Sequence, residues 1–243
     1  VVPVDSEDMA ALRENPNLER LVRQLEPQLE VIDDNEPQDV DSLDEAAKLV
    51  GFNVARIKSV PDNAGELSIS VARQKVVQLQ LDRDLLAAVF EAAEIDVDLP
   101  DSLDEEPVII THPNTVIQTW YRGGEEALRF VQMLAPTISY PDGLDLDALG
   151  VASLQLLGLS REQAESLGAT IDWANTMVLP VPSNAITEIE EVTLANGGKG
   201  LVFSNPDADQ DEAAIMWTQN GMSYLIRGSY GADAIKSMAS QVE

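Results

Sequence analysis

Near the end of the chain, oxygen-bearing side chains recur at every second position of one acidic stretch. They are Asn205, Asp207, Asp209 and Asp211. This spacing can aim several oxygens at one hard cation, but an EF-hand loop also needs a glycine and a glutamate where this chain has Gln210 and Met216. We interpret the stretch as a solvated acidic loop, with Asp207, Asp209 and Asp211 as candidate ligands of a calcium site. No other cofactor is expected.

The residue types give little support to nucleophilic catalysis. Cysteine is absent and His112 is the only histidine, which excludes disulfides, thiolate sites and any site that needs two imidazoles. The sequence also lacks a GxSxG nucleophile elbow. Because His112 precedes Pro113 between two apolar runs, we expect it to be a structural residue in a loop.

The glycine-rich segment 197–200 resembles a phosphate-binding loop only superficially. A P-loop needs GxxxxGK followed by serine or threonine and then a helix, whereas Gly200 begins an apolar run typical of a strand. We therefore predict a hairpin turn here. The sequence has no GxGxxG after a strand, so dinucleotide binding has no support either.

Paired carboxylates could perform acid–base chemistry, and the chain has 43 acidic residues. A glycosidase needs two carboxylates at a defined separation in a cleft, which spacing in sequence does not show, so we predict no catalytic residue. Trp120, Tyr121, Trp173 and Trp217 could line a sugar or peptide site, or they could pack in the core. A secreted carboxylate-dependent hydrolase, glycosidase-like, is therefore an alternative function, and a calcium or small-ligand binding protein is another.

The formal net charge of −28 limits the partners of this chain. Such a field repels phosphate backbones and anionic membrane surfaces, and no basic cluster interrupts it. We therefore expect no nucleic-acid binding and no binding to a membrane surface. The charge favours solubility, and it also fits a salt-rich habitat, a basic protein partner or loosely bound divalent cations.

An acidic linker at 33–41 divides the sequence into a short arm and a body. Leucine and valine recur near helical spacing over 5–30, which predicts an N-terminal helical arm. We predict the arm and its linker at 1–41 and an α+β body at 42–243. The body could divide into two subdomains that meet near 135–145.

The body mixes helical and strand patterns joined by short turns. Helices are predicted over 42–50, from Asp82 through 94, over 145–157, over 160–168 and after Gly231. Strands are predicted over 52–60, 67–71, 77–81, 107–111, 115–121, 177–182, 187–195, 200–204, 213–219 and 222–228. Residues 125–134 fit both the helical and the strand period, and we interpret them as a strand. This pattern favours an α+β fold with antiparallel sheets packed against several helices.

The hairpin near the end of the chain is the strongest local signal. Asn220-Gly221 supplies the two positive-φ positions of a type I′ turn. We expect Trp217 and Tyr224 to pack across the hairpin, and Gly228 to mark a bulge or a close backbone approach.

This hairpin and the helix after it resemble the C-terminal signature of an uncharacterised bacterial extracytoplasmic domain, found in anti-sigma-factor-like proteins and lipoproteins. The residues that carry the resemblance are Trp217, Gly221, Tyr224, Gly228, Ile235, Met238, Ala239 and Ser240. Looser similarities are LDEAA at 43–47 leading to Gly51-Phe52 and Val60-Pro61, and Ile171–Trp173 leading to Leu179–Pro182. The resemblance covers the last third most specifically and does not extend to the arm.

The resemblance implies a non-enzymatic role in the cell envelope, in sensing, regulation or protein interaction, and it supplies no catalytic residues. A membrane anchor would then lie upstream of Val1, because the longest uncharged runs span about 15 residues and a membrane-spanning helix needs about 20. The leading hypothesis is an extracytoplasmic sensor or protein-interaction domain, anti-sigma-like in its regulatory form, with another protein as partner.

Overall fold

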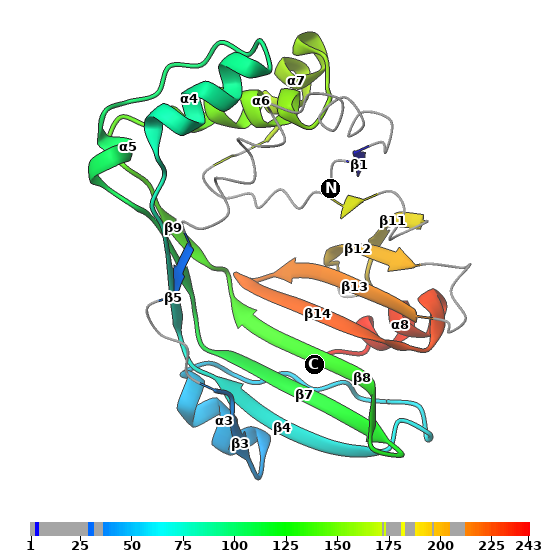
Figure 1. Ribbon diagram of the computed structural model, residues 1–243. Coiled ribbons are helices and arrows are strands. Elements are labelled where there is room, and N and C mark those ends of the chain that lie inside the picture. The colour runs from blue at the N-terminus through cyan, green and yellow to red at the C-terminus, as the bar shows by residue number, and fades with distance from the viewer. Residues whose placement is uncertain are drawn as a thin grey trace. The chain divides into compact units, whose positions relative to one another are not determined.

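The computed structural model describes residues 3–4, 29–31, 36–171, 173, 181–182, 188–195, 197–204 and 212–243. Figure 1 traces the chain with its helices and strands. The chain divides into two compact units, each assembled from three separate stretches. The first unit comprises Val1–Ile32, Val76–Thr111 and Thr137–Ala185, and the second comprises Asp33–Lys75, His112–Pro136 and Ile186–Glu243. Helices and antiparallel sheets together form the α+β fold that the sequence predicts.

Little of the predicted N-terminal arm falls among the described residues. Leu29–Val31 forms strand β2, so the helix predicted over 5–30 is wrong at its end, and most of the rest lies outside the described residues. Within the predicted linker, Gln38–Val40 forms the edge strand β3, because its backbone pairs with strand β4 (Glu66–Ala72). The boundary between arm and body stays a prediction.

The second unit is built on an antiparallel sheet of eight strands, which we call the large sheet. In spatial order its strands are β11 (Glu188–Thr193), β12 (Lys199–Ser204), β13 (Glu212–Gln219), β14 (Met222–Ser229), β8 (Glu125–Leu134), β7 (Thr115–Arg122), β4 and β3. Two-residue turns join β13 to β14 and β7 to β8, and β11 pairs with β12, the next strand along the chain. The segment that fitted both periods is the strand β8, as we interpreted it.

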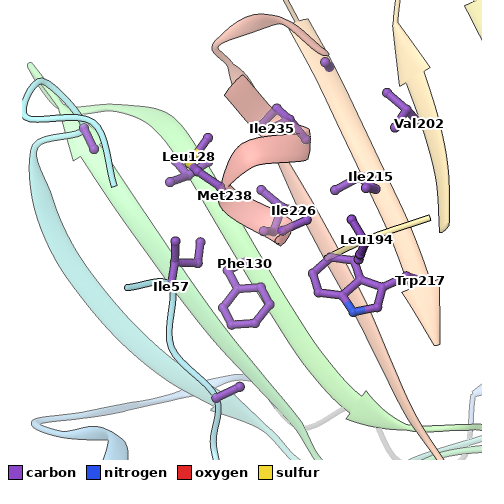
Figure 2. Close-up of a cluster of buried hydrophobic side chains, with 14 of the residues drawn as sticks. Ile57, Leu128, Phe130, Leu194, Val202, Ile215, Trp217, Ile226, Ile235 and Met238 are labelled. Carbon is purple, nitrogen blue, oxygen red and sulfur yellow. The ribbon is translucent and has the colours of Figure 1, made fainter. Parts of the chain in front are cut away.

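The hairpin β13–β14 packs as its sequence predicts. Asn220 and Gly221 have φ angles of 52° and 75°, the two positive values that the turn requires. Trp217 and Tyr224 lie opposite each other, and their stacked ring centroids are 4.9 Å apart. Phe130 of β8 stacks in the same cluster, 6.4 Å from the Trp217 ring, and Figure 2 shows Phe130 and Trp217 among their buried neighbours.

Two helices, α3 (Leu43–Val50) and α8 (Gly231–Ala239), pack on one side of the large sheet, which we call the first face. The buried side chains of this face come from alternate positions of the strands. They include Val116, Trp120, Leu128, Phe130, Ile215, Trp217 and Ile226. Helix α8 adds Ile235 and Met238 to this core, so the hairpin and helix close one hydrophobic core.

Helix α3 begins and ends where the sequence predicts. The Ser42 hydroxyl accepts a hydrogen bond from the Glu45 backbone N–H at 3.2 Å, and Gly51 ends the helix with φ of 79°. The reciprocal half of the predicted capping box differs, because the Glu45 carboxylate accepts from the backbone N–H of Asp41 rather than that of Ser42.

The strand predicted over 52–60 is wrong. This segment lies on the first face, where a single bridge pairs Ile57 with Val242. Its backbone bonds go to residues 241–243 and to two glutamine side chains. Ala55 donates its N–H to Gln132 Oε1 at 2.7 Å and accepts from Gln118 Nε2 at 2.8 Å. Because two buried glutamines and one isolated bridge take the place of a β-ladder here, the apolar residues of the segment reflect burial and not a continuous strand.

The first unit joins a four-stranded sheet to a group of helices. The sheet has the order β2, β5 (Lys75–Leu79), β6 (Val108–His112) and β9 (Thr137–Ser139), and Val181–Pro182 forms β10, parallel to β1 (Pro3–Val4). Among the described residues, its helices are α4 (Arg83–Ala92), α5 (Ser102–Glu105), α6 (Leu146–Leu156) and α7 (Arg161–Gly168). The start of the strand predicted over 177–182 lies outside the described residues. Every helix of the described residues is too short or too polar to span a bilayer.

Helices α6 and α7 pack around one tryptophan. Trp173 donates its ring N–H to the carbonyl of Gly168 at 3.2 Å. A Cβ on Gly150 of α6 would lie 2.3 Å from the Trp173 ring, so glycine is needed there for the close approach of the ring. The predicted capping box of α7 is present in both directions between Ser160 and Gln163.

Candidate functional site

The acidic ladder with Asp207, Asp209 and Asp211 lies outside the described residues, so the calcium site stays a prediction. In the rest of the chain, as far as the structure describes it, no group of three or more His, Asp or Glu side chains is placed to hold a metal ion.

The aromatic residues that could line a sugar site are distributed between core and surface. Trp120 and Trp217 are 6% and 3% exposed and belong to the core of the second unit. Trp173 packs between α6 and α7, whereas Tyr121 is exposed. His112 is the last residue of β6 and half-buried, so its prediction as a loop residue is wrong. The structure does not bring the three tryptophans together in one surface cluster.

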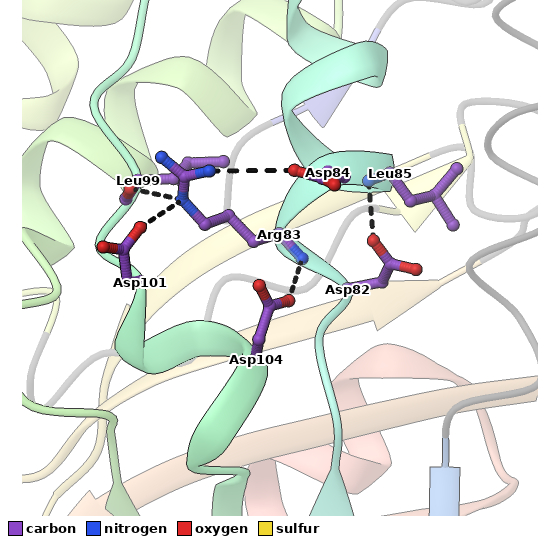
Figure 3. Close-up of polar contacts among 7 residues, drawn as sticks. All are labelled: Asp82, Arg83, Asp84, Leu85, Leu99, Asp101 and Asp104. Carbon is purple, nitrogen blue, oxygen red and sulfur yellow. Dashed lines mark hydrogen bonds and ion pairs between the residues drawn. The ribbon is translucent and has the colours of Figure 1, made fainter.

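One polar cluster of the first unit surrounds Arg83 (Figure 3). Its Nε donates to the Leu99 carbonyl at 2.9 Å and lies 3.5 Å from Asp101, and its backbone N–H donates to Asp104 Oδ1. Asp82 caps the same helix by accepting from the Leu85 N–H at 2.8 Å. These contacts hold the first turn of α4 against the chain that follows it. Arg83 therefore has a structural role.

The second face of the large sheet, opposite to α3 and α8, carries half-buried side chains in rows that cross the strands. One row, which we call the apolar row, runs from β7 to β12. It consists of Ile117, Val131, Leu225, Met216 and Leu201, each paired with the next. Each of these residues is only partly buried, while its neighbours along the strand face the core.

The adjacent row, two residues further along each strand, carries two arginines side by side. In this arginine row, Arg129 of β8 pairs directly with Arg227 of β14. Thr119, Ala214, Phe203 and Ile189 complete the row. Two like charges at directly opposite positions of neighbouring strands repel each other, so the pair needs an anion.

Glu126 supplies one carboxylate to both guanidinium groups. Its Oε2 accepts from Arg129 Nη2, and its Oε1 accepts from Arg227 Nη2 at 2.9 Å. The side chain of Arg129 is 32% exposed and that of Arg227 is 51% exposed. The Nε of Arg129 is buried and has no hydrogen-bond partner among the described residues. The cluster therefore has two positive charges, one negative charge and unused donors.

A β-bulge brings Glu126 onto this face. The register of β7 and β8 shifts between Trp120 and Tyr121, so that Trp120 pairs with Leu128 while Tyr121 pairs with Glu126. The extra residue, Ala127, changes the alternation, and the Glu126 side chain therefore lies on the same face as Arg129 although three positions separate them.

Gly228 accommodates the bulge from the neighbouring strand, as the sequence predicts. A Cβ at Gly228 would lie 2.5 Å from the carbonyl oxygen of Ala127. The glycine follows Arg227 directly and pairs with Leu128. The close approach of β14 to the bulge thus places Arg227 within reach of Glu126.

Lys236, another cation of the second unit, has the opposite charge balance. Lys236 of α8 donates to Asp233 at 2.9 Å and to Glu190 of β11 at 3.0 Å, and these hydrogen bonds, the one to Asp233 foremost, raise the pKa of Lys236. One cation here has two carboxylates, whereas two guanidiniums share one carboxylate at Glu126. The arginine cluster can therefore accept a further anion, which the lysine cannot do without losing a partner.

The sequence did not single out Arg129, Arg227 or Glu126. The pairs Arg129 and Val131 in β8, and Leu225 and Arg227 in β14, each lie two positions apart, so the sequence places each pair on one face of its own strand. It does not show that the two strands are neighbours. The pairing of β8 with β14 and the bulge at Ala127 are needed before the three residues meet. Comparison of the chain with protein-family models, with curated proteins and with solved structures gives no match.

Proposed function

We propose that this chain is a non-enzymatic sensor or protein-interaction domain of a bacterial cell-envelope protein, which acts outside the cytoplasm and is regulatory in an anti-sigma-like manner. The resemblance of the terminal hairpin and helix supports the location and the class. Its signature residues Trp217, Tyr224, Gly228 and Ile235 have structural roles in the second unit, which is consistent with a family that carries no catalytic motif there.

One observation carries the interaction function. The second face of the large sheet presents the apolar row, with one residue on each of five strands, next to a pair of arginines. The described helices α3 and α8 of the same unit pack on the first face. A face with partly exposed apolar side chains beside charged ones has the composition of a protein-interaction surface.

Site-specific photo-crosslinking tests this function. A photoreactive phenylalanine analogue is introduced at Leu225 in the apolar row, or at Leu49 on helix α3 as the control, in cells of the natural source. Leu49 is a large apolar residue that is 42% exposed and lies on the other side of the sheet. We expect a discrete adduct with a cell-envelope protein from position 225 and none from position 49.

Equal adduct patterns from the two positions would contradict a specific interaction surface. An adduct formed only with cytoplasmic proteins would contradict the proposed location while leaving the interaction in place.

A further inference from the structure

We propose that the Arg129–Arg227 pair binds a carboxylate side chain of an extended protein segment whose apolar side chains lie on the apolar row. This inference rests on the proposed interaction function and adds the chemistry of the partner. It assigns the second face one occupant, a segment with an acidic residue next to apolar ones.

Charge selects the acidic residue. The two guanidiniums lie on directly paired positions, and their hydrogen bonds within the described residues go to the single carboxylate of Glu126. Each guanidinium has five N–H donors in a planar fork that matches a carboxylate. A second carboxylate would neutralise the remaining positive charge and reduce the repulsion between Arg129 and Arg227.

Geometry selects an extended segment. The arginine row and the apolar row are two residues apart along every strand, a separation of about 7 Å. In an extended chain, side chains at positions i and i+2 point the same way with that same separation. When the segment runs nearly aligned with the strands beneath it, as in aligned sheet packing, an acidic residue and an apolar residue two positions apart fit both rows at once.

The chain's own charge argues against other occupants. A net charge of −28 repels an anionic membrane and a second copy of the same chain. A small molecule with a single carboxylate would bind the two arginines and leave the apolar row exposed. A protein segment uses both rows, and its apolar contacts offset the repulsion between its acidic group and the acidic protein.

Peptide selection followed by affinity measurement tests the proposal. The full chain is screened against a displayed library of random linear peptides, and the tightest peptide is the probe for calorimetric titration. We expect selected peptides to carry Asp or Glu two positions from an apolar residue. The Arg227→Gln variant should bind the probe at least about tenfold more weakly, the loss expected for a charge-assisted bond.

Two further variants separate binding from a merely structural role. Glu126→Gln removes the competing carboxylate and should bind the probe more tightly than the natural chain, although it leaves two arginines unpaired. Arg56→Gln is the matched control, because Arg56 also shares one carboxylate, that of Glu243, with a second cation, Lys58. We expect Arg56→Gln to leave the probe affinity unchanged.

Different outcomes would contradict the interaction function and the arginine site. If no peptide binds the full chain, the interaction function itself fails. If peptides bind but lack acidic residues, keep their affinity in Arg227→Gln, or bind Glu126→Gln more weakly than the natural chain, the arginine site is wrong while the interaction function stands. Sedimentation that shows an Arg227-dependent dimer would overturn the choice of a partner segment in favour of a second copy.

Discussion

Gln132 of strand β8 accepts, through Oε1, a 2.7 Å hydrogen bond from the backbone N–H of Ala55, a residue 77 positions earlier in the chain. The amide nitrogen of the same glutamine donates to the Asn53 carbonyl at 2.9 Å. One side chain thus binds a donor and an acceptor of a segment whose strand-like pairing, among the described residues, is limited to the bridge between Ile57 and Val242. The segment is held on the first face by this contact and by the companion bonds of Gln118 and Arg56.

Replacing Gln132 by leucine should destabilise the second unit. The substitution keeps most of the volume but leaves the buried Ala55 N–H without a partner, which costs about 1 to 3 kcal/mol. Urea unfolding followed by tryptophan fluorescence measures the change. Gln74→Leu, at an exposed position, is the matched control and should change the free energy of unfolding by less than about 0.5 kcal/mol. Equal effects at both positions would show that the Gln132 contact contributes nothing specific.

Gly228→Ala should destabilise the bulge next to the arginine pair. The added Cβ meets the Ala127 carbonyl oxygen at 2.5 Å, and a rigid backbone must move to relieve the contact. Such overpacking typically costs about 1 to 3 kcal/mol. Thermal unfolding of this variant is compared with that of Ser223→Ala on the same strand, which adds no atom. A Gly228→Ala protein as stable as the control would contradict the close approach.

Gly150→Ala in helix α6 should lower stability although alanine favours helices. Helix propensity alone predicts a gain of about 1 kcal/mol. The Trp173 ring, 2.3 Å from the added Cβ, must move, and we expect a net loss of about 1 to 3 kcal/mol. In a double-mutant cycle, the penalty should disappear when Trp173 is also replaced by alanine. A stabilised single variant would place the ring elsewhere.

The Glu243 carboxylate makes stability depend on pH at acidic values. The hydrogen bond from Lys58 foremost, and that from Arg56, lower its pKa. A lowered pKa in the folded state gives stability that is present above the ordinary carboxyl pKa and lost as the pH falls through the lowered value. The difference in melting temperature between the natural chain and Glu243→Gln should therefore shrink below about pH 4. A difference independent of pH would contradict this ion pair.

Local signals predict the parts of this fold that local physics decides. The turn at Asn220-Gly221 needs two positive φ angles that few residue pairs adopt, and the N-caps at Ser42 and Ser160 act within their own helices. Residues close together in the sequence determine these elements, so the sequence is sufficient to predict them. The packing of Trp217 against Tyr224 follows from the same hairpin register.

Contacts between distant residues decide the parts that the sequence does not predict. The segment 52–60 has the composition of a strand, but its backbone hydrogen-bonds to glutamines on β7 and β8 and to residues 241–243 near the end of the chain. The candidate site has the same origin, because Arg129 and Arg227 meet only through the β8–β14 register. Glu126 joins them only because a bulge changes the alternation of β8.

The most direct test of the arginine site follows the side chains themselves. The ¹H–¹⁵N resonances of the arginine Nε–H groups are recorded by NMR while the selected acidic peptide is added to the full chain. We predict that the Arg129 and Arg227 resonances shift in proportion to the bound fraction while that of Arg56 stays in place. Saturated binding with the Arg129 and Arg227 resonances unmoved would contradict the proposal.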